Sequence, residues 1–202
     1  MKKAIILTLL FNAINLSAQE TKSNYIGFVD SFQFTFGFTN LVSNHSMMGE
    51  AHKASFPLFT ARLGIFQINK LSVGLHASLH SMEVRNTNYY GYFTNTNAGT
   101  IGPYISYYQE ISESSLLEPY ISYDFVHYKS NYEDKKLKSE SDGLGLGIDY
   151  QHKISRKAYV TFGLKYSFNK MRTETHRNWE KYMNNYNFMT AKIGFTFSRN
   201  RL

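Results

Sequence analysis

The 202-residue sequence lacks cysteine and contains only three prolines and one tryptophan. Without cysteine there can be no disulfide framework, which excludes the small disulfide-stapled class of secreted domain. Beyond the first twenty residues no apolar run approaches the length of about 18 residues that a membrane-spanning helix needs. Phenylalanine and tyrosine are instead abundant, at 16 each, although the mean hydropathy is negative. An aromatic-rich chain that is polar on average suits β-strands with one apolar face, and its length suits a single domain.

The first residues have the pattern of an export signal. Lys2 and Lys3 precede an almost wholly apolar run from Ala4 to Leu10, and small residues follow at Ser17-Ala18. This order predicts a secretory signal peptide over residues 1–18, cleaved after Ala18. The alternative, a buried N-terminal helix, fits less well with the two lysines and the small residues. We therefore expect one mature domain over residues 19–202.

Strict alternation of apolar and polar residues dominates the rest of the chain. Residues 31–39 read SFQFTFGFT, which puts four phenylalanines on one face of a strand and small or polar residues on the other. The same period of two predicts eight strands, each about as long as a tilted membrane-spanning strand. Their expected ranges are 28–39, 58–68, 71–81, 100–109, 118–128, 143–152, 159–169 and 188–198.

The expected connections alternate between short and long. Short links fall near residues 67–70, 112–117 and 153–158, and longer polar links near 40–57, 82–99, 129–142 and 170–187. Short turns at one end and long loops at the other are typical of a bacterial outer-membrane barrel. The prediction is an all-β, eight-stranded antiparallel up-and-down transmembrane β-barrel, with both termini in the periplasm and four extracellular loops.

The second face of each strand separates this prediction from a secreted soluble β-sandwich. A sandwich would turn its polar face to water and carry many charges there. Here that face is mostly Gly, Ser, Thr and Tyr, and Gly143, Gly145 and Gly147 share it on one strand. Glycines weaken a solvated strand, whereas small residues fit the narrow interior of an eight-stranded barrel. The phenylalanines are therefore expected to face lipid.

At this point the chain resembles a known family. The predicted signal peptide, the eight alternating strands and the closing aromatic segment from Lys192 to Phe197 are similar to the small outer-membrane β-barrels of the OmpA/OmpX type. The resemblance implies the bacterial outer membrane, with membrane lipid and lipopolysaccharide as surroundings. It also implies that the barrel-assembly machinery reads Phe195 and Phe197 as an assembly signal. It names no extracellular ligand.

Several charged residues and histidines have inward parity. We interpret them as a polar network that fills the lumen, because buried charges must be paired and hydrogen-bonded; the alternative is a narrow ion pore. The set comprises Arg62, His76, His80, Asp124, Asp149, Lys165 and Lys192. His76 and His80 are four residues apart on a strand, roughly 13 Å, which is too far to share a metal ion. We expect no metal and no cofactor.

Function is sought in the loops and in one enzyme alternative. Trp179, flanked by Arg177 and Lys181, is a candidate for extracellular contacts, since barrels of this kind carry function on loops. Interfacial anchoring of Trp179 is an equal alternative. His127, Ser130 and Glu133 are considered for a lipid A-modifying acyl hydrolase or acyltransferase, but their spacing matches no familiar pattern and no catalytic residue is assigned. The formal charge of +7 is dispersed, so no nucleic-acid partner is expected. A structural or surface-interaction protein is favoured over an enzyme.

Overall fold

The computed structural model describes residues 26–42, 45–53, 55–90, 93–132, 135–174 and 176–198. Its elements are almost all strands, and no described helix is long and apolar enough to cross a membrane. The predicted signal peptide at residues 1–18 lies outside the described residues. The strands are β1 (Ile26–Leu41), β2 (Ser55–Ile68), β3 (Leu71–Glu83), β4 (Asn95–Tyr107), β5 (Gln109–Ser112), β6 (Ser115–Tyr132), β7 (Lys135–Lys153), β8 (Ala158–Met171) and β9 (Asn185–Ser198). The short helices are α2 (Met47–Ala51), α3 (Thr87–Tyr90) and α4 (Glu180–Asn184).

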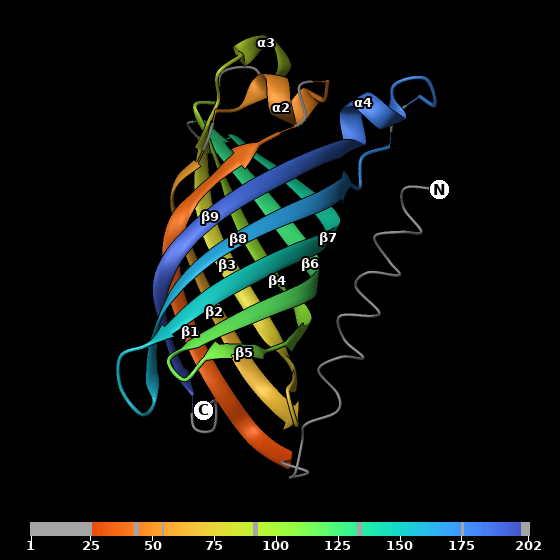
Figure 1. Cartoon of the computed structure of the whole chain (residues 1–202). Coiled ribbons are helices and arrows are strands. Elements are labelled where there is room, and N and C mark those ends of the chain that lie inside the picture. The colour runs from red at the N-terminus through yellow and green to blue at the C-terminus, as the bar shows by residue number, and fades with distance from the viewer. Residues whose placement is uncertain are drawn as a thin grey trace.

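The strands form one closed antiparallel barrel (Figure 1). The sheet runs in the order β4-β3-β2-β1-β9-β8-β7-β6-β5, and pairing of β4 with β6 closes it. β5 continues β4 after a break at Tyr108, so the barrel has eight positions around its wall. The predicted eight-stranded antiparallel barrel is confirmed. Closure pairs the backbone along both sides of every wall position, which a sheet surrounded by hydrocarbon requires.

The two ends of the barrel differ. Helices α2, α3 and α4 gather at one end, in the long connections between strands (Figure 1). The opposite end holds the tight turns, including Asn69–Lys70 between β2 and β3. The last described residue, Ser198, is also at the turn end, where its backbone N–H donates to the Lys157 carbonyl. This is the predicted alternation of short and long connections, except between β6 and β7.

The outer surface of the barrel is apolar. In β1, Phe32, Phe34 and Phe36 are each about half exposed, whereas Gln33 and Thr35 between them are buried. The phenylalanine face of residues 31–39 therefore points outward, and the small polar face lines the lumen. Every strand around the wall exposes large aliphatic or aromatic side chains in the same way. So large a continuous apolar surface is not found on a water-soluble monomer, and it matches a lipid-facing belt.

Glycine makes room inside the barrel where bulky side chains cross it. The inward glycines of β7 each face a side chain from a neighbouring strand. A methyl group at Gly147 would overlap the ring of Tyr120, and one at Gly145 would meet Lys165 and Ser122. The Gly143-Leu-Gly145-Leu-Gly147 pattern is therefore a packing feature, because the narrow eight-stranded interior leaves no room for side chains beside these large neighbours.

One predicted long loop is wrong. The charged stretch 129–142 was expected to be a long loop, but β6 and β7 continue through it as a paired hairpin from Lys129↔Lys138 to Tyr132↔Lys135. Lys129, Lys138 and Glu140 are exposed on the outer face of this hairpin, so the apolar alternation disappears while the backbone pairing persists. Periodicity therefore marks the extent of the membrane belt and not the extent of the strand.

A charge on the lipid-facing belt should be costly in a manner that depends on depth. Leu164, in the middle of β8, is half exposed on the outer face, and Ile154, in the turn before β8, is exposed beyond the belt. We expect L164R to lower the free energy of unfolding in lipid vesicles by about 2–4 kcal/mol and the matched control I154R by about 0–1 kcal/mol. Urea titration monitored by fluorescence measures both. Equal effects of the two arginines would contradict a lipid-facing belt.

Candidate functional site

Arg62 of β2 is the central side chain of the lumen. Its Nη2 lies 2.6 Å from Glu118 Oε1 of β6, and its Nη1 lies 2.7 Å from Asp149 Oδ2 of β7. The guanidinium also stacks between the rings of Tyr104 and Tyr120, at 4.3 and 4.4 Å from their centroids. Two carboxylates satisfy its charge and two aromatic faces cover its plane, an arrangement that planar, weakly hydrated arginine suits better than lysine does. Arg62 thereby joins β2, β4, β6 and β7 across the lumen.

A second cation shares Asp149 with Arg62. Lys192 Nζ of β9 donates to Asp149 Oδ2 at 3.0 Å and to Gln33 Oε1 at 3.2 Å. The Gln33 amide in turn donates to Asp149 Oδ2 at 2.9 Å and to Thr196 Oγ1 at 3.1 Å. All of these side chains are buried. Three donors, from Arg62, Lys192 and Gln33, thus converge on Asp149 Oδ2 and tie β1, β2 and β9 to β7.

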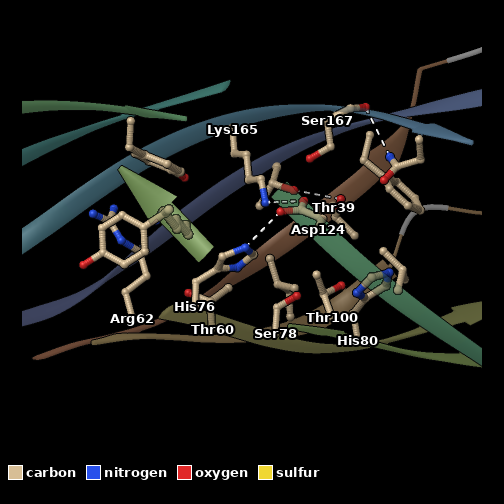
Figure 2. A pocket seen from close by; sticks show the side chains of 18 residues that line it. Thr39, Thr60, Arg62, His76, Ser78, His80, Thr100, Asp124, Lys165 and Ser167 are labelled. Carbon is tan, nitrogen blue, oxygen red and sulfur yellow. Dashed lines mark hydrogen bonds and ion pairs between the residues drawn. The ribbon is translucent and has the colours of Figure 1, made fainter. Parts of the chain in front are cut away.

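A third cation, Lys165, pairs with Asp124, next to the ion pairs made by Arg62 and Lys192. His76 Nε2 of β3 is 2.9 Å from Asp124 Oδ1, and Lys165 Nζ of β8 is 2.6 Å from Asp124 Oδ2. Figure 2 shows both side chains converging on the carboxylate. Ser122 donates to the same carboxylate at 2.8 Å. The described lumen thus pairs the cations Arg62, Lys165 and Lys192 with the carboxylates Glu118, Asp124 and Asp149.

His80 is set apart from this network, although it shares a strand face with His76. Its side chain is 9% exposed, and neither ring nitrogen has a hydrogen-bond partner among the described residues. The edge of its ring meets the Phe188 ring, with centroids 5.6 Å apart. It faces a cavity of about 60 Å³ that also touches Arg62 and Asp124. Of the seven residues predicted for the interior, six are in the ion-pair network and His80 is not.

Glu118 is the member of the network that sequence reasoning missed. It shares the inward parity of Tyr120 and Asp124 on the same strand, and it is almost fully buried. Its Oε1 accepts from Arg62, and its Oε2 accepts from the amide of Gln151. Parity extended to the first residue of the predicted strand would have identified it. Gln33 and Gln151 also have inward parity, but neutral amides were not included among the candidate charges.

The long first connection folds into the barrel mouth. Met48 and Ala51 of α2 are fully buried in an apolar cluster with side chains from the strand ends. His52 follows α2 and is buried; its Nδ1 donates to the Met48 carbonyl at 3.2 Å, and its Nε2 lies 2.9 Å from Thr96 Oγ1. Burial lowers the pKa of His52, against the smaller opposing effect of the Met48 carbonyl. The other members of the cluster, here called the apolar cap together with Met48 and Ala51, are Met82, Val84, Ala98, Val126, Tyr128, Met171, Tyr186 and Phe188.

The residues considered for lipid hydrolysis are not brought together. His127 is exposed on the outer face, 3.5 Å from Glu140 Oε1, whereas Ser130 is buried inside and bonded to Thr96. Glu133 lies outside the described residues. No outward serine or threonine adjoins His127 on the described parts of β4, β6 and β7, so this part of the wall offers the histidine no hydroxyl nucleophile. The described residues also contain no cluster of three or more metal-binding side chains.

The predicted contact and assembly residues lie at the two ends of the barrel. Trp179 is 60% exposed just before α4, and Arg177 and Lys181 beside it are also exposed. The Trp179 ring meets Tyr182, whose hydroxyl donates to Glu50 of α2 at 2.8 Å. Phe195 and Phe197 point outward from the last strand, in the lipid-facing belt near the turn end.

Removing the central cation should be far more damaging than removing an exposed one. We expect R62M to lower the free energy of unfolding in detergent by about 3–5 kcal/mol, because Glu118 and Asp149 lose a buried partner. The matched control is K70M, which removes the cation of the Lys70–Glu110 pair in a turn (3.8 Å) and should cost under about 1 kcal/mol. Adding E118Q to R62M should recover part of the loss. Equal losses in R62M and K70M would contradict a structural role for Arg62.

The comparisons with known proteins establish the fold. No protein-family model and no curated protein matches the sequence. Among solved structures, Neisserial surface protein A (NspA) matches with a TM-score of 0.62 and 14% identity over 83% of this chain and 96% of NspA. The outer membrane protein OprG from Pseudomonas aeruginosa matches with a TM-score of 0.51 and 12% identity over 85% of this chain and 97% of OprG. The chain has the fold of the small eight-stranded outer-membrane β-barrels, as its resemblance to that group predicted.

Proposed function

We propose that this protein is a bacterial outer-membrane barrel with a closed lumen, whose work is done by contacts on its extracellular side. The observation that carries the proposal is the contrast between the two faces of the wall. Outward side chains form an apolar belt, while inward charges are neutralised by one another. A barrel built in this way is stable in lipid and offers solutes no aqueous channel, so its function is left to its exposed ends.

Closure of the lumen is supported at three levels. The apolar cap covers the mouth at the helical end, with Met48 and Ala51 of α2 fully buried in it. The ion-pair network centred on Arg62 fills the middle. Near the turn end, Leu116 and Tyr159 are fully buried in a second apolar cluster with Tyr108. A narrow ion pore would need charged groups with free hydration sites along a continuous path, and here the charges are bonded to each other.

The contact surface that we propose consists of Arg177, Trp179 and Lys181. An exposed aromatic ring between two cations can pack on a partner while the cations pair with its anionic groups. The Tyr182–Glu50 hydrogen bond joins this segment to α2, which is itself anchored in the apolar cap. The surface is therefore held in place by the barrel mouth. We propose the phosphate groups of lipopolysaccharide as its partner, because they are the anions nearest to an exposed loop on the outer side of such a membrane.

The proposal also includes how the protein is exported and assembled into the membrane. Residues 1–18 would direct secretion and be cleaved after Ala18. The outward rings of Phe195 and Phe197, on the last strand, would be read by the barrel-assembly machinery. NspA and OprG, which share the fold, are described by their names as a surface protein and an outer membrane protein. These names support an outer-membrane location for the present chain.

A lipid A-modifying enzyme is the less supported alternative. The outward pair of His127 and Glu140 could orient a general base, since a carboxylate 3.5 Å from the ring resembles the second half of a catalytic triad. A hydroxyl nucleophile is missing beside His127, because Ser130 points into the lumen and bonds to Thr96. A base with no nucleophile beside it does not favour acyl transfer over a simple surface ion pair.

Single cysteines test the location and the orientation, because the native chain has none. Arg177 is exposed at the helical end, and Arg156 is exposed in the turn between β7 and β8. On intact cells a membrane-impermeant maleimide should label R177C and should label R156C only after the outer membrane is permeabilised. Equal labelling of both variants on intact cells, or recovery of the protein from the medium, would reject the proposal.

The sole tryptophan distinguishes a contact surface from a membrane anchor. In vesicles, Trp179 fluorescence should be quenched by aqueous iodide and little affected by lipids brominated near the headgroup, because the ring points to water. Adding lipopolysaccharide to the vesicles should protect Trp179 from iodide. The variant R177A/K181A keeps the fluorophore and should lose this protection. Strong quenching by brominated lipid without lipopolysaccharide would show that Trp179 is an interfacial anchor instead.

A further inference from the structure

Among the described residues, a cavity lies in the lumen between the charge network and the apolar cap. It has a volume of about 60 Å³ and lies between them, since its lining includes Arg62 and Tyr120 on one side and Val126 and Phe188 on the other. A single water needs roughly 10–15 Å³ of such volume. The cavity therefore has room for a small hydrated group, but not for a sugar or an amino acid.

The charges that line this cavity are predominantly positive. Arg62, Lys165 and Lys192 all border it, but only one carboxylate, Asp124, does so. The other two carboxylates of the network, Glu118 and Asp149, are not among the lining residues. Asp124 is already held by His76, Lys165 and Ser122. The network is balanced as a whole, yet the part that faces the cavity presents an excess of cations and hydrogen-bond donors.

His80 supplies the feature that packing alone does not explain. It is nine-tenths buried, it borders the cavity, and neither of its ring nitrogens has a hydrogen-bond partner among the described residues. Figure 2 shows it beside Ser78 and Thr100, which also line the cavity, and away from the group around Asp124. A buried imidazole that makes no hydrogen bond costs free energy, so a ligand that accepts from it would be favoured.

We propose that this cavity binds one small inorganic anion, of which chloride is the representative. An anion there would accept from a His80 N–H and from the hydroxyls of Ser78 and Thr100, and it would sit in the positive potential of Lys165 and Lys192. A cation would meet the same positive potential, and the one carboxylate of the lining, Asp124, already contacts Lys165, Ser122 and His76. A sugar phosphate or an organic acid as large as gluconate would exceed the available volume. The proposal goes beyond the extracellular contact function and does not depend on it.

The test measures whether chloride stabilises the folded barrel through His80. Urea unfolding in detergent is followed at constant ionic strength while sodium chloride replaces sodium gluconate, whose anion is too large for the cavity. Above the dissociation constant, each tenfold rise in chloride should raise the folded-to-unfolded ratio tenfold. H80F keeps a ring of similar size but removes both nitrogens, and it should abolish the dependence. The matched control H127F changes a histidine on the outer face and should leave it intact.

Further measurements keep the test decisive if H80F folds poorly. The double variant S78A/T100V removes two lining hydroxyls with little change of shape and should weaken the chloride dependence while folding normally. Crystals grown in bromide should show an anomalous peak beside His80. The proposal is overturned if chloride and gluconate are equivalent for the native protein, if the dependence survives in H80F, or if bromide is found only on surface lysines. None of these outcomes bears on the labelling of R177C, so the two proposals fail separately.

Discussion

Closure of an eight-stranded sheet in hydrocarbon is the constraint on which the rest of this structure depends. Every backbone donor and acceptor in the membrane must be paired within the wall, and eight strands leave an interior only as wide as the side chains that enter it. The chain meets both requirements by alternating apolar residues with small or polar residues along each strand. Phe32, Phe34 and Phe36 point outward to the lipid, whereas Gln33 and Thr35 between them point into the lumen.

The narrow interior explains why the lumen is ionic and not simply polar. Long side chains from opposite walls must meet near the axis, and a charge that is buried there needs a charged or hydrogen-bonding partner. Arg62 is therefore matched with Glu118 and Asp149 and covered by two tyrosine rings. The same narrowness explains the glycines of β7, because Tyr120 can cross the lumen only where Gly147 faces it. The narrow radius of the barrel thus explains both the pairing of the inward charges and the glycines beside large side chains.

Sequence reasoning reached those features that depend on local geometry. The alternation identified all eight wall positions and the inward side of Arg62, Asp124 and Lys192, because side-chain direction in a strand is fixed by the adjacent peptides. It could not show that His76 and Lys165 share Asp124, since that depends on the register between strands far apart in sequence. It also gave no sign that α2 enters the mouth. Met48 and Ala51 form only a short apolar segment in a polar loop, and their burial depends on a pocket built from several strand ends.

The apolar clusters at the two ends of the lumen connect the fold to the proposals. A cap that depended only on polar contacts would admit water to the ion pairs and weaken them, because screening lowers the energy of each pair. The apolar cap covers the helical end of the lumen, next to the cavity that His80 lines. The α2 segment therefore has two neighbours of functional interest: the cavity below it, and above it the Trp179 surface that Tyr182 joins to Glu50.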